Sequence, residues 1–285
     1  MGDMDALPQE LMEKIVSRTR SVDAGGSLSI VSESFQSAAI SDNVWSTFLP
    51  VDLISRRTLH SLPNPDFDDP WNNIDSSTLQ DFPTNKDLYL FLSDNPLIID
   101  DGAMCFWLDK ISGIRCFHLF PRTFSYGKPY HFLEHCCYQK RIGFAPELSS
   151  VYILEICGKI STSLLSPDTT YTAYLMFDIT NFYFGGFGEE QPLETYVGTD
   201  GGYPSDCKTV YIPKMPYDYD GSDGSMNSDR PILTDPQYPQ IREKGTRAYH
   251  VELGDYFNKK SGDKKELKMS LSEVKSAKEK LVSLF

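Results

Sequence analysis

The chain contains 285 residues, 40% of them hydrophobic and 24% charged, which predicts a soluble globular protein with one large domain or two smaller ones. Its formal net charge of -13 disfavours nucleic acid and membrane surfaces as partners, because a negative surface repels phosphate groups. The six cysteines have no metal-type spacing and no long apolar run is found, so we expect reduced thiols, no metal or cofactor, and a location in the cytoplasm or nucleus.

Residues 6–50 carry a helical pattern of apolar side chains. Pro8 suits the first turn of a helix, Gly25 and Gly26 break the helical pattern, and Ser41 with Asp42 can cap a third short helix. The apolar stripes comprise Leu11, Met12, Ile15 and Val16, then Leu28, Val31 and Phe35, then Val44, Trp45 and Phe48. We therefore expect a small module of three helices.

Residues 51–85 have the composition of a linker, with four prolines among Asn, Asp and Ser. A short helix is expected over residues 86–92, and it should end near Asn95-Pro96 because the residue before a proline disfavours the helical conformation. Residues 213–246 form a second long stretch rich in Pro, Gly, Asp and Ser, which predicts a functional or disordered loop.

After about residue 104 the hydrophobic pattern alternates with a period of two, which is typical of β-strands. Strands separated by loops rich in Gly, Pro and Asp favour an antiparallel sandwich. The strands expected from this pattern cover residues 151–156, 171–179, 208–212, 249–253 and 267–271. A final amphipathic helix is expected over residues 271–284, with Ser270 and Glu273 forming a capping box.

The N-terminal pattern resembles the F-box, a short helical module that joins a substrate receptor to a ubiquitin ligase. The resemblance rests on the ordered set Leu7-Pro8, Leu28-Ser29 with Val31-Ser32, and Val44-Trp45, and it covers residues 3–50. Gly25 and Gly26 depart from the usual Cys and basic residue at this place. By resemblance, the side chains that bury against a Skp adaptor are Leu7, Pro8, Leu11, Ile15, Leu28, Val31 and Trp45. Three helices that pack only on their own chain are the structural alternative.

Residues 86–285 resemble the phloem protein 2-like (Nictaba-like) lectin domain. The phrases that carry the resemblance include Leu154-Glu155-Ile156-Cys157-Gly158-Lys159-Ile160, Leu165-Ser166-Pro167-Asp168-Thr169-Thr170-Tyr171 and Val251-Glu252-Leu253-Gly254-Asp255-Tyr256. The resemblance implies a jelly-roll-like β-sandwich of lectin type. The relatives continue into a further Gly-rich strand beyond the position of Phe285.

In that family, two Trp and two Glu form the sugar site. Aromatic faces stack on sugar rings and carboxylates accept hydrogen bonds from hydroxyl groups. The matching positions here are Tyr126 and Phe132, which replace the two Trp, together with Glu266 and Glu273. Two core aromatics, a surface Glu and a helix-capping Glu are the alternative interpretation of the same residues.

Together the two resemblances predict an α+β multidomain protein that acts as the substrate-recognition subunit of an SCF-type (cullin–RING) E3 ubiquitin ligase. The implied partners are the Skp adaptor, the cullin, and a protein or glycoprotein target, with an N-glycan or chitooligosaccharide as ligand. Such a subunit performs no catalysis and raises the local concentration of its target. A stand-alone carbohydrate-binding protein and a glycan hydrolase remain the alternatives, which adaptor binding and glycan turnover would distinguish.

Overall fold

The computed structural model describes residues 7–19, 21–54, 82–127, 131–133, 147–151, 154–178, 192–199, 207–211, 240–241, 248–260, 264–273 and 280–284. Most of the expected linker at 51–85 and of the loop at 213–246 lies outside these residues. The chain divides into two compact units, Met1–Phe120 and Pro121–Phe285. The division reflects packing, and the sequence-based domain bounds remain predictions.

Short helices at the start of the first unit form where the sequence supplies local signals. Ser32 caps α3, because its side chain accepts a hydrogen bond from the Phe35 amide (3.4 Å), and Thr84 caps α6 in the same way through Asp87. The helices are α1 (Gln9–Val16), α2 (Ser21–Gly25), the 3₁₀ helix η2 (Ser27–Ile30), α3 (Glu33–Ile40), α4 (Asp42–Phe48), α5 (Val51–Ile54) and α6 (Asn85–Asp94). The expected first, second and third helices and the helix near 86–92 are thus confirmed in outline.

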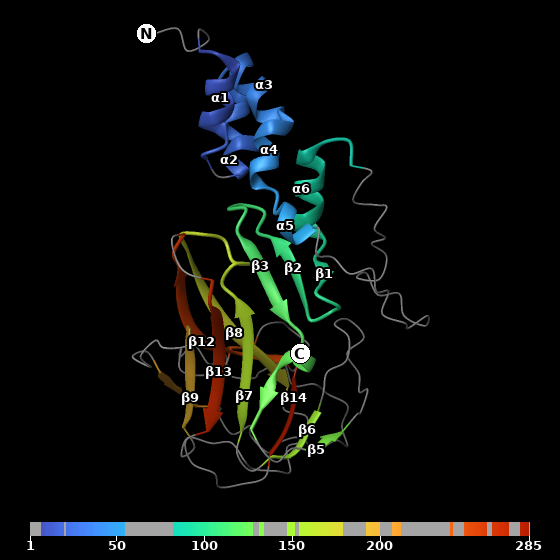
Figure 1. Cartoon of the computed structure of the whole chain (residues 1–285), viewed down its shortest axis with the longest axis vertical. Coiled ribbons are helices and arrows are strands. Elements are labelled where there is room, and N and C mark those ends of the chain that lie inside the picture. The colour runs from blue at the N-terminus through green and yellow to red at the C-terminus, as the bar shows by residue number, and fades with distance from the viewer. Residues whose placement is uncertain are drawn as a thin grey trace, which may run out of the picture. The chain divides into compact units, whose positions relative to one another are not determined.

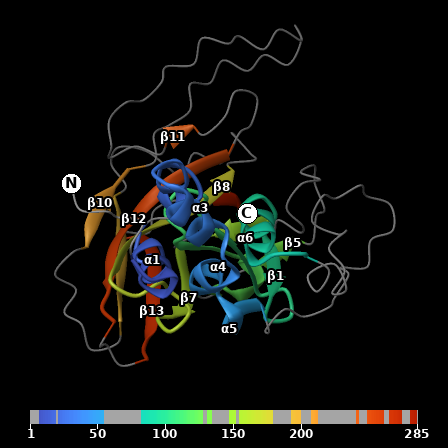
Figure 2. The same cartoon turned by 90° about the horizontal axis from the view of Figure 1, so that it is seen from above.

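Helix α4 lies between α1 and α6 when the first unit is viewed from above (Figure 2). The core of α1, α2, α3 and α4 consists of Met12, Val16, Ala24, Phe35, Ala38 and Val44. A three-stranded antiparallel sheet completes this unit, with β1 (Leu97–Ile99), β2 (Met104–Leu108) and β3 (Arg115–Leu119) in that order (Figure 1). Asp100, Asp101 and Gly102 all have positive φ in the β1–β2 turn, where Asp and Gly tolerate the left-handed conformation.

The second unit contains two antiparallel sheets, with strand orders β10-β9-β13-β7-β4 and β11-β12-β8-β14-β6-β5. Its elements are η3 (Pro121–Thr123), β4 (Ser125–Tyr126), β5 (His131–Leu133), β6 (Glu147–Val151), β7 (Glu155–Ser161), β8 (Thr169–Asp178), β9 (Leu193–Thr199), β10 (Lys208–Val210), β11 (Gln240–Ile241), β12 (Ala248–Asn258), β13 (Glu266–Glu273) and β14 (Lys280–Leu284). The α+β composition and the antiparallel pairing are therefore confirmed.

One hydrophobic core joins side chains from both sheets. Ile156 of β7 and Leu271 of β13 come from the five-stranded sheet, and Leu175 of β8 and Val251 of β12 come from the six-stranded sheet. Gly254 in β12 has φ +145°, and a Cβ there would lie 3.3 Å from a methyl group of Val197. The close approach of β12 to β9 thus requires a glycine at this position.

Two sequence predictions are wrong in this unit. The expected final helix is not formed, because residues 266–273 are strand β13 between β7 and β9, and residues 280–284 are strand β14, which pairs with β6 and β8. The apolar residues are spaced three or four apart, as in an amphipathic helix, but pairing with neighbouring strands overrides this local preference. The strand expected at 151–156 is also divided, because β6 ends at Val151 and β7 begins at Glu155.

Candidate functional site

The most distinctive surface of the first unit lies on α1, where apolar side chains fall into two adjacent stripes. Met12 and Val16 are fully buried in the core. Leu7, Leu11 and Ile15 recur every four residues and keep 41%, 47% and 43% of their surface exposed. The single stripe expected from the sequence therefore has one buried part and one exposed part. Exposed aliphatic side chains aligned on one helix are typical of a protein-binding surface.

Among the described residues up to 54, three further large aliphatic side chains are exposed. Ile30 and Val31 lie at the end of η2, and Ile40 ends α3, with exposed fractions of 85%, 56% and 62%. We define the apolar surface as Leu7, Leu11, Ile15, Ile30, Val31 and Ile40. The sequence interpretation missed Ile30 and Ile40. Both are aliphatic residues outside the apolar stripe that faces the core, and this position in the pattern could have identified them as exposed.

Glu13 fixes α1 against the start of α4. Its carboxylate accepts hydrogen bonds from the Ser41 hydroxyl (2.7 Å) and from the Asn43 side-chain amide (3.2 Å). These two bonds, led by the one from Ser41, lower the pKa of Glu13. Ser41 thereby uses its hydroxyl for α1 and makes no side-chain cap on α4, contrary to the expected capping role.

A Glu13→Gln variant should unfold with a free energy lower by about 1 kcal/mol at pH 7, the usual effect of losing such a hydrogen bond. Because the folded pKa is lowered, the contribution of Glu13 is present above its unfolded pKa and disappears as pH falls through the folded pKa. The wild-type and variant proteins should therefore converge in stability as the pH falls below the lowered pKa of Glu13. Urea unfolding followed by helical circular dichroism measures this, with Glu10→Gln on the same helix as control.

The remaining residues expected to contact an adaptor have different surroundings. Pro8 is exposed at the start of α1, and Leu28 is partly buried against the core. Trp45 is only 2% exposed, and its indole N–H donates to the Ala39 carbonyl at 2.7 Å. Trp45 therefore packs in the core of the first unit in this structure.

The four residues expected at a sugar site are distributed over the second unit. Glu266 and Glu273 occupy opposite ends of β13 and, being an odd number of residues apart, opposite faces, about 23 Å apart along the strand. Tyr126 pairs with Ile156 on β7 and packs against the core, on the same face as Glu273. Phe132 pairs with Leu148 through its backbone, and its side chain lies outside the described residues. The described side chains thus do not converge on one site.

The two carboxylates also have separate local partners. Glu266 forms an ion pair with Lys159 at 2.7 Å on the exposed face of the sheet. Glu273 is 8% exposed, and its carboxylate accepts a hydrogen bond from the Leu154 amide (3.2 Å), while its own amide donates to the Leu154 carbonyl (2.8 Å). Glu273 therefore holds the start of β7 in place.

Other chemistry has little support in the described residues. Burial raises the pKa of the Cys105 thiol to about 12 and that of Cys116 to about 11, which keeps both protonated near neutral pH. Within the described ranges, His, Cys, Asp and Glu form no group of three that could hold a metal ion. None of the described helices is both long enough and apolar enough to span a membrane.

Comparisons with known proteins show which family the chain resembles. The family model described as phloem protein 2 matches residues 115–282. The F-box protein At2g02240 of Arabidopsis thaliana is 33% identical over 95% of this chain and 75% of its own length. The putative F-box protein PP2-B2 is 30% identical over 91% of this chain and 74% of its own, and the F-box protein SKIP3 is 28% identical over 97% and 84%, both from the same plant.

Proposed function

Because the chain belongs to the plant F-box proteins that carry a phloem protein 2 domain, we propose that it is a substrate-recognition subunit of an SCF-type E3 ubiquitin ligase. The first unit binds the Skp adaptor and, through it, the cullin. The second unit binds the target. The protein performs no catalysis itself and acts by holding the target near the ubiquitin-charged enzyme, in the cytoplasm or nucleus.

The observation that carries this proposal is the apolar surface defined above. Leu11 and Ile15 are exposed on α1, Leu7 is exposed just before it, and the neighbouring stripe of the helix already fills the core. The exposed stripe is therefore not needed for the packing of the helices. Burial of exposed aliphatic side chains by a partner favours binding by about 25 cal/mol per Å² of apolar surface removed from water. A partner with a complementary apolar groove explains why α1 carries both stripes.

The second unit supplies the target-binding part of the proposal. A closed β-sandwich of jelly-roll-like lectin type is supported by the core that both sheets share. The target is a protein or glycoprotein, and the ligand on it is an N-glycan or chitooligosaccharide, as the relatedness to phloem lectins suggests. A sugar site built from Tyr126, Phe132, Glu266 and Glu273 remains a proposal, and it would require contributions from both ends of β13.

The adaptor role is tested with a double variant, Leu11→Asp with Ile15→Asp, in the full chain. Both positions are exposed, so the helices should stay folded, but two carboxylates at the interface would be left unpaired on binding. We expect affinity for the purified Skp adaptor to fall about 100-fold or more, as when central interface residues are lost. The measurement is calorimetric titration of adaptor into wild-type and variant protein.

Phe257 supplies the control, because it is 48% exposed on β12 in the second unit and lies outside the apolar surface. Phe257→Asp should bind the adaptor as the wild type does. Equal binding by the double variant would remove α1 from the interface. No binding by the wild type would refute the ligase role and favour a stand-alone carbohydrate-binding protein, and product release from a labelled chitooligosaccharide would favour a hydrolase.

A further inference from the structure

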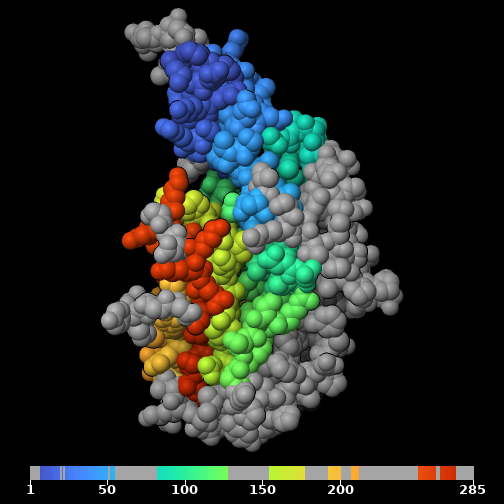
Figure 3. Space-filling model, in the orientation of Figure 1, coloured from blue at the N-terminus to red at the C-terminus, as the bar shows by residue number. Residues whose placement is uncertain are grey.

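Helix α6 completes the core of the helices that precede it. Tyr89 of α6 is 1% exposed, and its ring lies 5.2 Å from that of Trp45 and 6.2 Å from that of Phe48, both on α4. Figure 3 shows α6 in direct contact with α4, with no gap between the two helices. Aromatic rings at these separations contribute to stability beyond the area they bury. Residues 42–48 thus depend on a helix that begins at Asn85.

Two successive hydrogen bonds connect Tyr89 of α6 with α2 and with the β2–β3 turn. The Tyr89 hydroxyl donates to the Ser21 hydroxyl at 2.7 Å, and Ser21 in turn donates to the Ile111 carbonyl at 3.2 Å. Ser21 is the first residue of α2 and is 2% exposed. Burial is the main cause of the raised pKa of Tyr89, so the hydroxyl remains a donor over the physiological range. Helix α2 is therefore held by groups from α6 and from the β2–β3 turn.

The β2–β3 turn, residues 109–114, has a fixed shape that suits this contact. The Asp109 carboxylate accepts hydrogen bonds from the Ser112 hydroxyl (2.7 Å), the Ser112 amide (2.8 Å) and the Ile111 amide (3.2 Å). Gly113 has φ +72°, and a Cβ there would lie 3.3 Å from the Tyr89 hydroxyl oxygen. The turn is thus shaped by its own residues before it meets Ser21 and Tyr89.

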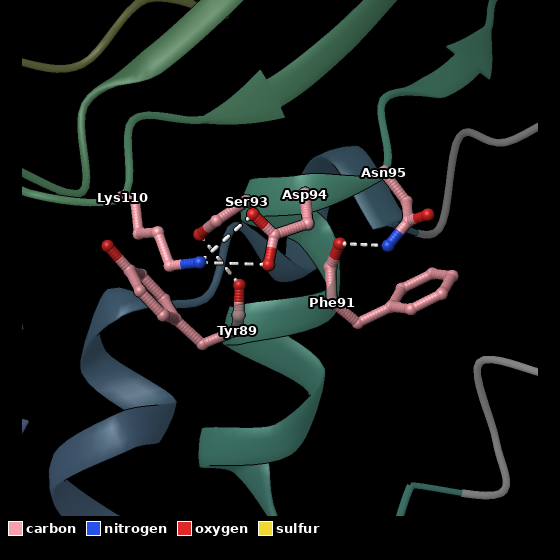
Figure 4. Close-up of polar contacts among 6 residues, drawn as sticks. All are labelled: Tyr89, Phe91, Ser93, Asp94, Asn95 and Lys110. Atoms are coloured by element: carbon pink, nitrogen blue, oxygen red, sulfur yellow. Dashed lines mark hydrogen bonds and ion pairs between the residues drawn. The ribbon is translucent and has the colours of Figure 1, made fainter.

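Polar pairs at the surface connect the same elements. Lys110 of the turn is directed at Asp94 near the end of α6, with an Nζ–Oδ2 distance of 2.9 Å (Figure 4). The Asp42 carboxylate accepts a hydrogen bond from the Asn85 amide at 2.8 Å. Exposed ion pairs contribute little stability, so we assign the main coupling to the buried network of Tyr89 and Ser21.

We infer that α6 and the 109–114 turn are a structural part of the adaptor-binding module, with Tyr89 and Ser21 as positioning residues for the apolar surface. Helix α2 contacts η2 and α3, which carry Ile30, Val31 and Ile40. Fixing the position of Ser21 therefore also fixes the positions of Ile30, Val31 and Ile40, which a partner would contact. This inference rests on the proposed function, and it extends the module from residues 3–50 to include α6 and the 109–114 turn.

The test compares the full chain with Tyr89→Phe, which keeps the ring and removes the hydroxyl. We expect adaptor affinity to fall about tenfold, and amide hydrogen exchange in α2 and η2 to accelerate by a similar factor, as when a buried hydroxyl is left without its partner. Ser21→Ala should have a similar effect. The double variant should lose less than the sum of the two single losses, because both changes remove the bond between Tyr89 and Ser21, although each also removes a separate contact with a carbonyl of the turn.

Tyr171→Phe is the matched control, since its hydroxyl accepts a hydrogen bond from the Ser166 amide at 2.7 Å in the second unit. It should destabilise the protein without changing adaptor affinity. Wild-type affinity in Tyr89→Phe, or additive losses in the double variant, would overturn the inference while leaving the proposed function intact. Failure of the wild type to bind would instead refute the function itself.

Discussion

An Asn258→Asp variant should lose about 4 kcal/mol of the unfolding free energy of the second unit, enough to unfold much of it at 37 °C. Asn258 is a buried residue at the end of β12. The two N–H groups of its side-chain amide are shared among three carbonyl oxygens, those of Ser166 (3.0 Å), Leu165 (3.2 Å) and Thr162 (3.3 Å). A carboxylate oxygen in the same place has no hydrogen to donate and faces three negative partial charges.

The loop that Asn258 holds connects β7 of one sheet to β8 of the other. The same loop is held by a hydrogen bond from the Lys260 amide to the Asp168 carboxylate at 3.0 Å. Losing the contacts of Asn258 should therefore loosen both sheets together. Protonation of the new carboxyl group restores one donor, so the deficit should narrow as the pH falls from 7 toward 4.

Urea unfolding measures the loss of stability, and native-state hydrogen exchange of the β7 and β8 amides shows whether both sheets loosen. Asn95→Asp is the control, because Asn95 also donates from its side-chain amide to a backbone carbonyl, that of Phe91 at 2.9 Å (Figure 4), but is only partly buried. It should cost only about 1 kcal/mol, the effect of one hydrogen bond. Equal costs for both variants would show that burial of the amide of Asn258 is unimportant.

Trp45→Ala should cost the first unit about 4 kcal/mol, in the range measured for deletion of buried aromatic side chains. The ring of Trp45 packs on Phe48 and Tyr89, and a Cβ at Gly25 would lie only 3.4 Å from it. Removing the indole leaves a cavity and an Ala39 carbonyl that has lost its donor. Adaptor binding should be lost because the helices that carry the apolar surface would unfold.

Hydrogen exchange separates the two units in this experiment. Amides of α1, α3 and α4 should exchange fast in Trp45→Ala, while those of β7, β12 and β13 keep wild-type rates. Trp107→Ala, at a partly exposed position on β2, is the control and should cost less. Wild-type adaptor affinity in Trp45→Ala would contradict the assignment of Trp45 to the core of the module.

Elements with strong local signals were predictable from the sequence. Strand β8 places Tyr171, Ala173, Leu175 and Phe177 on one face, and α6 follows a capping Thr84 and ends at Asp94, two residues before Pro96. The C-terminal residues were ambiguous, because Leu271, Leu281 and Leu284 fit helical spacing equally well. The strand forms because β14 pairs with β6 and β8. Pairing with strands distant in the sequence cannot be recognised from the local pattern of residues.

The candidate surface was predictable in part. Leu7, Leu11 and Ile15 followed from the order of the motif, but the motif gives no information on whether a side chain points inward, and the burial of Trp45 could not be read from it. The separation of Glu266 and Glu273 could have been inferred, because seven residues along one strand place two side chains on opposite faces. The contact of Tyr89 with Ser21 spans 68 residues and could not have been predicted.

The most direct test of the account is hydrogen–deuterium exchange of the full chain with and without purified Skp adaptor at saturation. We predict protection over residues 7–16, 27–31 and 33–40, which carry the apolar surface, and unchanged exchange in β7, β12 and β13. Protection confined to the second unit, or none at all, would contradict the assignment of the apolar surface as the adaptor-binding site.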